Sequence, residues 1–231
     1  MKKTVALLFI MTSALLLLSA ATVSLGLEAG ADYNMIKSGN GYRNYTYSDK
    51  IGAAASIPVL IEFTPSLALE TGVSYYLKNF GYSRSVSEDT SSVPVKTLDY
   101  TSYNHFVELS AAFHYTYAIP QSSTLYLIAS GGGFIGFWVY GSRAGYAYSI
   151  SRNPKLTYFK DTLNLDNYSI FQAGVYASLG VKWQFSRKTS LFIRAGYSYT
   201  LTDLNKMQKY GAYPVHISTI VLSGGIMWRV N

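Results

Sequence analysis

The stretch SIFQAGVYASLGVKWQF, from Ser169 to Phe185, decides the fold because apolar residues occupy every second position along it. A repeat of two residues is that of a β-strand, whereas an amphipathic helix repeats every 3.6 residues. Strands of soluble proteins usually run for about five or six residues, far fewer than in this stretch. The pattern therefore predicts a wall with an apolar face toward lipid and a small or polar face inward. The outward positions would be Phe171, Ala173, Val175, Ala177, Leu179, Val181, Trp183 and Phe185.

The same alternation recurs along the rest of the chain and predicts an all-β protein, a transmembrane antiparallel up-and-down β-barrel of about eight strands. An even number of strands places both chain termini on the periplasmic side, as barrels of the bacterial outer membrane require. The predicted strands are Leu25–Tyr33, Ile51–Phe63, Leu67–Tyr82, Tyr103–Tyr117, Thr124–Tyr140, Ser169–Phe185, Ser190–Leu201 and Val215–Val230.

The predicted connections alternate in length, which is typical of short periplasmic turns and long exterior loops. The short ones are Thr64–Ser66, Ala118–Ser123 and Ser186–Thr189, and the long ones are Ile36–Lys50, Ser83–Ser102, Gly141–Tyr168 and Thr202–Pro214. In the third long connection, apolar and polar residues alternate on both sides of the turn dipeptide Asn153-Pro154. This pattern predicts a hairpin that projects past the membrane. Counting that hairpin as two further spans gives a ten-stranded alternative.

Composition supports a single membrane domain. The chain has 231 residues, of which 16% are aromatic and only 13% are charged, against about 25% charged residues in a soluble domain. Tyrosine, present 22 times, suits strands and the membrane–water interface. The absence of cysteine excludes disulfides, thiolate metal sites and a lipid anchor on an N-terminal cysteine.

The N-terminal segment predicts a signal peptide. Lys2 and Lys3 precede an apolar run from Val5 to Leu18, and the small residues Ser19 to Ala21 follow. The run of about 15 residues is shorter than the roughly 20 that a membrane-spanning helix needs. We expect residues 1–21 to be the signal peptide, with Ser24 as an alternative cleavage point, and residues 22–231 to be the barrel.

Two segments carry a resemblance to a known family: IPVLIEF, residues 57–63, which enters a turn, and LETGVSYY, residues 69–76, which leaves it. The chain resembles the outer membrane protein beta-barrel domain superfamily, whose small members are OmpA- or OmpX-like. That resemblance implies the bacterial outer membrane as location, outer-membrane lipids and lipopolysaccharide as surroundings, and the barrel assembly machinery as partner. Gly224, Ile226, Trp228 and Val230 resemble the family's final-strand assembly signal, although Asn231 replaces its terminal Phe.

Charged and titratable residues fall on the predicted inner face of several strands. They are Glu28, Glu70, Glu108, His114, Lys182 and Arg194. Buried charges must be paired or hydrated, because an unpaired one costs several kcal/mol. Since Glu70, Lys182 and Arg194 lie at similar distances from their turns, we expect one network that fills an interior too narrow for an open pore. The alternative is a gated ion path through the same network.

An enzymatic function has one weak signal. His216-Ile217-Ser218 resembles the His-x-Ser element of lipid A deacylase barrels, but Thr219 stands where that family has Asn. No carboxylate is placed to orient His216 as a base, as a catalytic triad requires. No spacing of His or carboxylate residues indicates a metal site. We therefore expect no catalytic residues, no metal and no cofactor.

The formal net charge is +7, or +5 once Lys2 and Lys3 leave with the signal peptide. In the predicted exterior loops basic residues are interleaved with many tyrosines and with several Asp and Glu residues. Export makes nucleic acid an improbable partner, and such loops suit lipopolysaccharide phosphates or another anionic surface ligand. The sequence predicts a non-enzymatic barrel with a filled polar interior and loops for surface binding or adhesion. The alternatives are a narrow channel for ions or small solutes and, third, an outward-facing lipid A or phospholipid hydrolase.

Overall fold

The computed structural model describes residues 22–38, 45–84, 96–149, 155–163, 169–203 and 215–230, all in strands and short turns. Within these ranges no helix is long and apolar enough to cross a membrane. The predicted signal peptide lies outside them, so its cleavage stays a prediction. The strands are β1 (Thr22–Ser38), β2 (Tyr45–Glu62), β3 (Leu67–Arg84), β4 (Lys96–Ala118), β5 (Leu125–Ser149), β6 (Lys155–Thr162), β7 (Phe171–Gln184), β8 (Thr189–Thr200) and β9 (Val215–Arg229).

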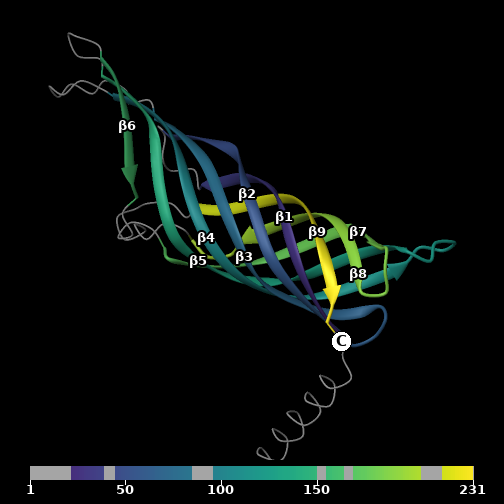
Figure 1. Cartoon of the computed structure of the whole chain (residues 1–231). Coiled ribbons are helices and arrows are strands. Elements are labelled where there is room, and N and C mark those ends of the chain that lie inside the picture. Colours follow the sequence, from purple (N-terminus) through teal and green to yellow (C-terminus); the bar gives the residue numbers. More distant parts are fainter. Residues whose placement is uncertain are drawn as a thin grey trace, which may run out of the picture.

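Eight of these strands close into a ring (Figure 1). Each pairs antiparallel with its neighbour in the chain, except that β5 pairs with β7, and β1 closes the ring against β9. The ninth strand, β6, pairs with the outer part of β5 and takes no place in the ring among the described residues. The eight-stranded prediction is therefore confirmed, and the ten-stranded alternative is wrong.

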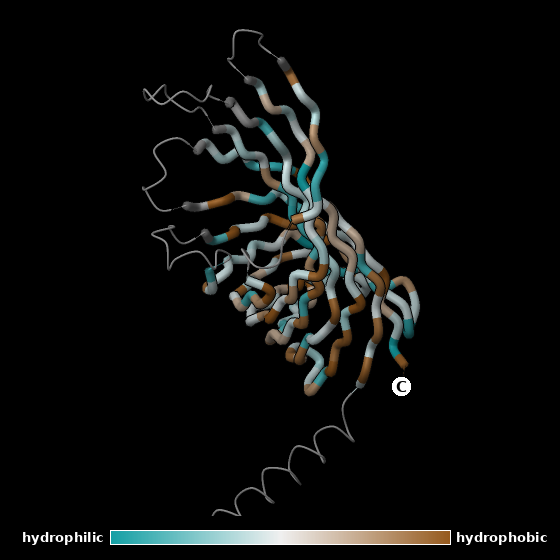
Figure 2. The backbone as a smooth tube through the Cα atoms, turned by 90° about the vertical axis from the view of Figure 1, so that its left-hand side faces the viewer, coloured by the Kyte–Doolittle hydropathy of each residue, from teal (hydrophilic) through white to brown (hydrophobic). Residues whose placement is uncertain are grey.

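The predicted alternation of faces is confirmed along β7. Its odd-numbered residues from Phe171 to Trp183 point outward, and the even-numbered residues are more enclosed. Leu179, on the outer face, is 70% exposed. Large apolar side chains on the outside of a closed sheet are those of a barrel solvated by lipid. Figure 2 shows hydrophobic and hydrophilic residues alternating along the strands, with hydrophobic ones frequent in the barrel.

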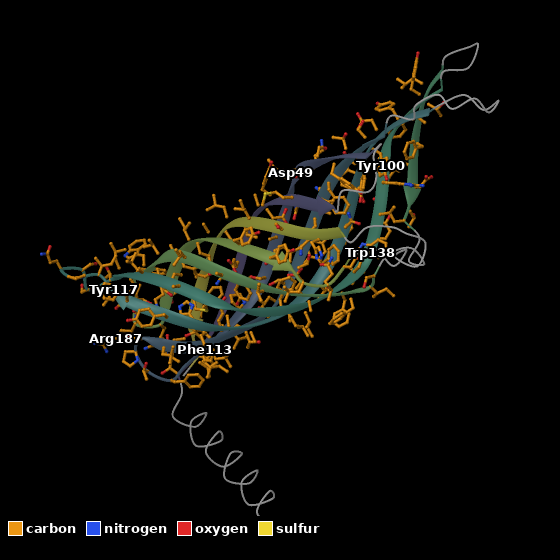
Figure 3. The ribbon with its side chains drawn as sticks, turned by 180° about the vertical axis from the view of Figure 1, so that it is seen from behind. Asp49, Tyr100, Phe113, Tyr117, Trp138 and Arg187 are labelled. Atoms are coloured by element: carbon orange, nitrogen blue, oxygen red, sulfur yellow. The ribbon has the colours of Figure 1, made fainter. Side chains whose placement is uncertain are left out.

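Short turns gather at one end of the barrel, as predicted. They span residues 63–66, 119–124 and 185–188, and in Figure 3 Tyr117 and Arg187 lie together at this short-turn end. At the outer end several strands run further than the alternation alone predicted. β4 has 23 residues and β5 has 25, whereas β8 has 12. Parts of three of the four predicted long connections are therefore strand, including residues 36–38, 45–50, 96–102 and 141–149. The fourth, Thr202–Pro214, lies almost entirely outside the described residues.

The projecting hairpin predicted around Asn153-Pro154 is confirmed, although its tip lies outside the described residues. β5 and β6 pair from Ser142–Thr162 to Ser149–Lys155. Near the base of this extension the register of β4 and β5 shifts: Phe106 faces Trp138, whereas His105 faces Tyr140. The extra residue in β5 is a β-bulge, which changes which side chains of a strand face inward and bends the strand. Beyond it, even-numbered residues of β5 continue the outer face.

Candidate functional site

The barrel interior is organised around Arg194 on β8. Its guanidinium donates two parallel hydrogen bonds to Glu28, from Nε to Oε1 at 2.7 Å and from Nη2 to Oε2 at 2.6 Å. Nη1 donates a third to Oε1 of Glu70 at 2.5 Å. A planar guanidinium between two carboxylates provides the strong bidentate geometry that a lysine cannot. Three of the predicted interior charges are thus brought together from β1, β3 and β8.

Neutral side chains complete this cluster, which we call the Arg194 network. The Glu28 carboxylate also accepts hydrogen bonds from the hydroxyls of Ser56 at 2.7 Å and Ser223 at 2.5 Å. Glu70 Oε2 accepts one from Ser130 at 2.7 Å and lies 3.0 Å from His114 Nδ1. Because both carboxylates have several donors, the buried charges are well compensated.

Two of the predicted interior residues, Glu108 and Lys182, do not contact the Arg194 network. Glu108 pairs instead with Lys78, at 2.5 Å between Nζ and Oε1, in a nearly inaccessible part of the interior. Sequence reasoning missed Lys78, although it lies eight residues after Glu70 on β3 and so shares its inner face. The expectation that Lys182 joins the network is wrong. Its ammonium lies over the Tyr126 ring, 5.1 Å from the centroid, nearer the short-turn end.

An apolar cluster lies inside the outer part of the barrel, beyond the charged residues. Phe80, Phe106 and Ile217 are almost completely buried there. Trp138, Tyr82 and Leu163 pack with them from β5, β3 and the end of β6. We call these six residues the mouth cluster. The sequence did not predict it, because its members come from five strands whose register depends on how the ring closes.

Two small cavities lie among the described residues inside the barrel, one on each side of the Arg194 network. The upper cavity, about 70 Å³, lies toward the outer end beside Ser74, Tyr76 and Glu108. The lower cavity, about 40 Å³, opens toward the short-turn end. Both are lined by Glu70 and Arg194, so the ion pair between these residues separates them. Cavities of this size hold only a few water molecules.

The outer face of the β5–β6 hairpin carries large side chains with little cover. Tyr146 faces Tyr158 across the two strands, with ring centroids 5.4 Å apart in an edge-to-face arrangement. Tyr148 faces Leu156 one step further out. Each of the four is between 41% and 61% exposed. We call them the surface patch. On the opposite face of the hairpin, the Arg143 guanidinium packs over the rings of Tyr100 and Phe159.

The residues of the weak enzymatic signal lie on the outer face of β9 but do not form a catalytic pair in the described part of the chain. His216 Nδ1 bonds the backbone carbonyl of Thr200 at 3.1 Å, and its ring stacks on Tyr199. The Ser218 hydroxyl accepts a hydrogen bond from Tyr197 at 3.1 Å, and Ser218 is fully buried. Among the described residues no group of three His, Asp or Glu could hold a metal ion.

The predicted assembly signal lies at the end of β9. Gly224, Ile226 and Trp228 pair with Ala29, Leu27 and Leu25 of β1, all on the outer face. Val230 follows the strand and is exposed. Their arrangement fits an alternating lipid-facing final strand. Recognition by assembly machinery stays a prediction.

Several solved structures are similar to the chain in architecture. Neisserial surface protein A matches with a TM-score of 0.46 and 12% identity over 89% of this chain and 96% of that one. OprG from Pseudomonas aeruginosa matches at 0.45 and 10% identity over 91% and 97% of the two chains. Ail, the attachment invasion locus protein of Yersinia pestis, matches at 0.38 and 12% identity over 89% and 98%. These similarities do not bear on function.

No curated protein matches the sequence. The family model for the outer membrane protein beta-barrel domain matches residues 18–206, which is most of the chain. This match agrees with the closed ring of eight antiparallel strands, their apolar outer faces and their polar interior. The short-turn end is accordingly the periplasmic end. The chain belongs to the outer membrane protein beta-barrel domain family and is a small β-barrel of the bacterial outer membrane.

Proposed function

We propose that the protein is a non-enzymatic outer-membrane barrel that presents the β5–β6 hairpin at the cell surface as a binding element. The observation that carries this proposal is the exposed surface patch of Tyr146, Tyr148, Leu156 and Tyr158. These side chains stand on strands that continue beyond the barrel ring (Figure 1). The barrel wall then serves as an anchor, and binding belongs to its outer end.

Strand length supports a position of the patch outside the membrane. A tilted strand crosses the apolar layer in about 9 to 11 residues. β5 has 25 residues and β4 has 23, more than twice that number. At about 3.3 Å per residue, Tyr148 lies roughly 26 Å along the strand from Tyr140, which is level with His105 near the base of the extension. An arm of this length extends well past the outer membrane surface.

The chemistry of the patch suits recognition of another molecule. Tyrosine combines a large apolar ring with a hydroxyl and loses little conformational freedom when it is covered, which makes it frequent in binding surfaces. A cluster of four such exposed residues is unusual on a surface that faces water. The neighbouring outer face is polar, with Asp99 opposite Tyr146 and Lys160 two residues from Tyr158. An apolar centre with a polar rim is typical of interaction sites.

The interior supports an anchor rather than a pore. The mouth cluster occupies the outer part of the lumen, and the Arg194 network crosses the middle, which supports a filled interior. Eight-stranded barrels are generally just wide enough for side chains to fill. A solute would have to pass both an apolar barrier and an ionic barrier to cross the lumen, which favours an anchor over a channel.

A hairpin-trimmed variant tests the proposal. Residues 145–159 are replaced by Asn-Gly, which joins β5 to β6 through a two-residue turn. Cells that express the wild-type protein should bind an array of immobilised polysaccharides and matrix glycoproteins, and trimmed cells should lose that binding. Tyr146→Ser with Tyr158→Ser should weaken it by about tenfold or more. The matched control, Tyr115→Ser with Tyr117→Ser, changes two equally exposed tyrosines at the periplasmic end and should bind normally.

Either of two results would contradict this function: absence of binding by wild-type cells on every surface, or equal binding by the trimmed variant. The non-enzymatic part has its own test in the acyl composition of lipid A. Expression of the wild type and of Ser218→Ala should leave it unchanged and identical. Loss of an acyl chain with the wild type alone would instead assign a hydrolase activity.

A narrow channel is the second candidate, and one observation favours it. The upper and lower cavities meet at the Glu70–Arg194 ion pair, so rearrangement of a single contact would join them. The mouth cluster would still have to open for conduction. We therefore rank this function below surface binding.

A further inference from the structure

The lower cavity lies at the periplasmic mouth, among the ends of β2, β7, β8 and β9. Glu70 and Arg194 form its inner end, and the β7–β8 turn with Arg187 and Lys188 forms its rim. Figure 3 shows Arg187 at this end of the molecule, where Tyr117 also lies. A small molecule in the periplasm could therefore enter without crossing the Arg194 network or the mouth cluster.

The cavity has more cations than the surrounding carboxylates neutralise. Arg194 is held by Glu28 and Glu70, and Arg229 pairs with Glu62 at 3.1 Å. Three further cations line the same space: Lys182, Arg187 and Lys188. In the part of the chain that the structure describes, none of their side chains makes an ion pair or a hydrogen bond. The periplasmic mouth is therefore a positively charged recess.

Lys182 is the innermost of the three. Its side chain is half-buried on the inner face of β7, and its ammonium stands over the Tyr126 ring. A cation partly withdrawn from water is stabilised by a counter-charge, and the nearby Glu62 is already engaged by Arg229. An anion in the cavity would provide that counter-charge.

Neutral hydrogen-bond donors surround the same space. The hydroxyls of Ser24, Thr189 and Ser190 line the cavity, and Gln184 stands beside them. Hydroxyl donors together with cations from several directions match an oxyanion whose oxygens point several ways. A tetrahedral phosphate fits this requirement better than a planar carboxylate, which presents two oxygens in one plane.

We propose that the lower cavity binds a phosphate group from the periplasmic side. Lys182 is its principal contact, and Arg187 and Lys188 of the β7–β8 turn attract the phosphate at the entrance. Two sources share this chemistry: free phosphate, and the headgroup of a phospholipid in the inner leaflet of the outer membrane. The cavity is small, about 40 Å³, so the glycerol and acyl chains of a lipid would remain outside at the rim.

The test uses the full protein, purified from outer membranes in an uncharged maltoside detergent. Inorganic phosphate and dihexanoylphosphatidylglycerol are titrated separately while amide NMR signals of Lys182, Tyr126 and the 186–189 turn are followed. We expect saturable shifts with at least one probe, and weaker binding at 300 mM than at 50 mM salt because screening increases.

Lys182→Met should weaken binding by about tenfold or more, and Arg187→Gln with Lys188→Gln should weaken it less. Lys50→Gln, an exposed lysine at the other end, should bind normally.

Each outcome decides between the possibilities. Saturation by inorganic phosphate that Lys182→Met removes supports a site for free phosphate. Saturation by the short-chain lipid alone, again lost in Lys182→Met, supports the headgroup as ligand. The proposal is overturned if neither probe saturates, or if Lys182→Met binds as well as Lys50→Gln. The double turn variant alters only exposed residues, so it reports on binding even if Lys182→Met folds poorly.

Discussion

Arg194 and Glu28, which are 166 residues apart in the chain, meet through two parallel hydrogen bonds of 2.7 and 2.6 Å inside the barrel. This contact links β1 to β8, two strands separated in the ring by β9. The third guanidinium nitrogen reaches Glu70 on β3 on the other side of the lumen. One arginine therefore ties three strands across the interior.

Replacement of Arg194 by Met should strongly destabilise the barrel. The substitution keeps much of the side-chain volume but leaves Glu28 and Glu70 as like charges without their cation. Breaking a buried ion pair by removing one partner generally costs about 3–5 kcal/mol. Urea unfolding in lipid vesicles, followed by tryptophan fluorescence, measures the free energy of unfolding.

The triple variant Arg194→Met with Glu28→Gln and Glu70→Gln is the matched control. It removes the uncompensated charges and should recover much of the lost stability. An Arg194→Met protein as stable as the wild type would show that the network is not a structural element.

Two adjacent glycines of β5 should respond differently to alanine. A Cβ at Gly132 would lie 2.1 Å from the Ala111 carbonyl oxygen and 2.5 Å from Ala112 Cα, so the backbone of β4 would have to move. A Cβ at Gly131 would meet nothing within 4 Å. Gly132→Ala should therefore cost about 1–3 kcal/mol, as overpacking does. Gly131→Ala should stay within about 0.5 kcal/mol of the wild type or stabilise it.

The same urea titration distinguishes the two glycine variants. Equal effects would mean that β4 and β5 are not as close at Gly132 as the structure has them. A destabilised Gly131→Ala with a normal Gly132→Ala would reverse the assignment of inner and outer faces on β5.

Arginine on the lipid face should be costly in the middle of a strand and tolerated at its outer end. Leu179 on β7 is 70% exposed and lies on the apolar outer face, while Leu201 follows the outer end of β8. Leu179→Arg should lower the free energy of unfolding in vesicles by about 2–4 kcal/mol, and Leu201→Arg by about 0–1 kcal/mol. Similar small costs at both positions would place the apolar layer elsewhere along the barrel.

The alternation of faces could be predicted from sequence because it depends only on the pleat of each strand. Glu28, Glu70 and Arg194 were assigned to the interior on that basis, and the structure places them there. The pairing of Glu108 with Lys78 could not be predicted, because it depends on the register that ring closure imposes. Lys182 was assigned to the correct face but to the wrong depth for the same reason.

Strand ends were harder to predict than strand faces. The sequence predicts that the strands beside Tyr146 and Tyr148 project past the membrane as a hairpin, and β5 does continue to them. The end of that strand is nevertheless predicted too early, at Tyr140, because Gly141, Ser142 and Gly145 interrupt the apolar pattern. The β-bulge opposite His105 also shifts the alternation by one residue, so a continuous period of two fails there. The mouth cluster, assembled from five strands, has no local sequence signal.

The central claim is that the barrel interior is closed, and single-channel recording of the purified protein in a planar bilayer tests it most directly. Heat-modifiable gel migration confirms that the inserted protein is folded. We predict a folded barrel without discrete current steps, because the mouth cluster and the Arg194 network both block the lumen. Discrete steps whose conductance rises in proportion to salt concentration would contradict a closed interior and make the protein a channel.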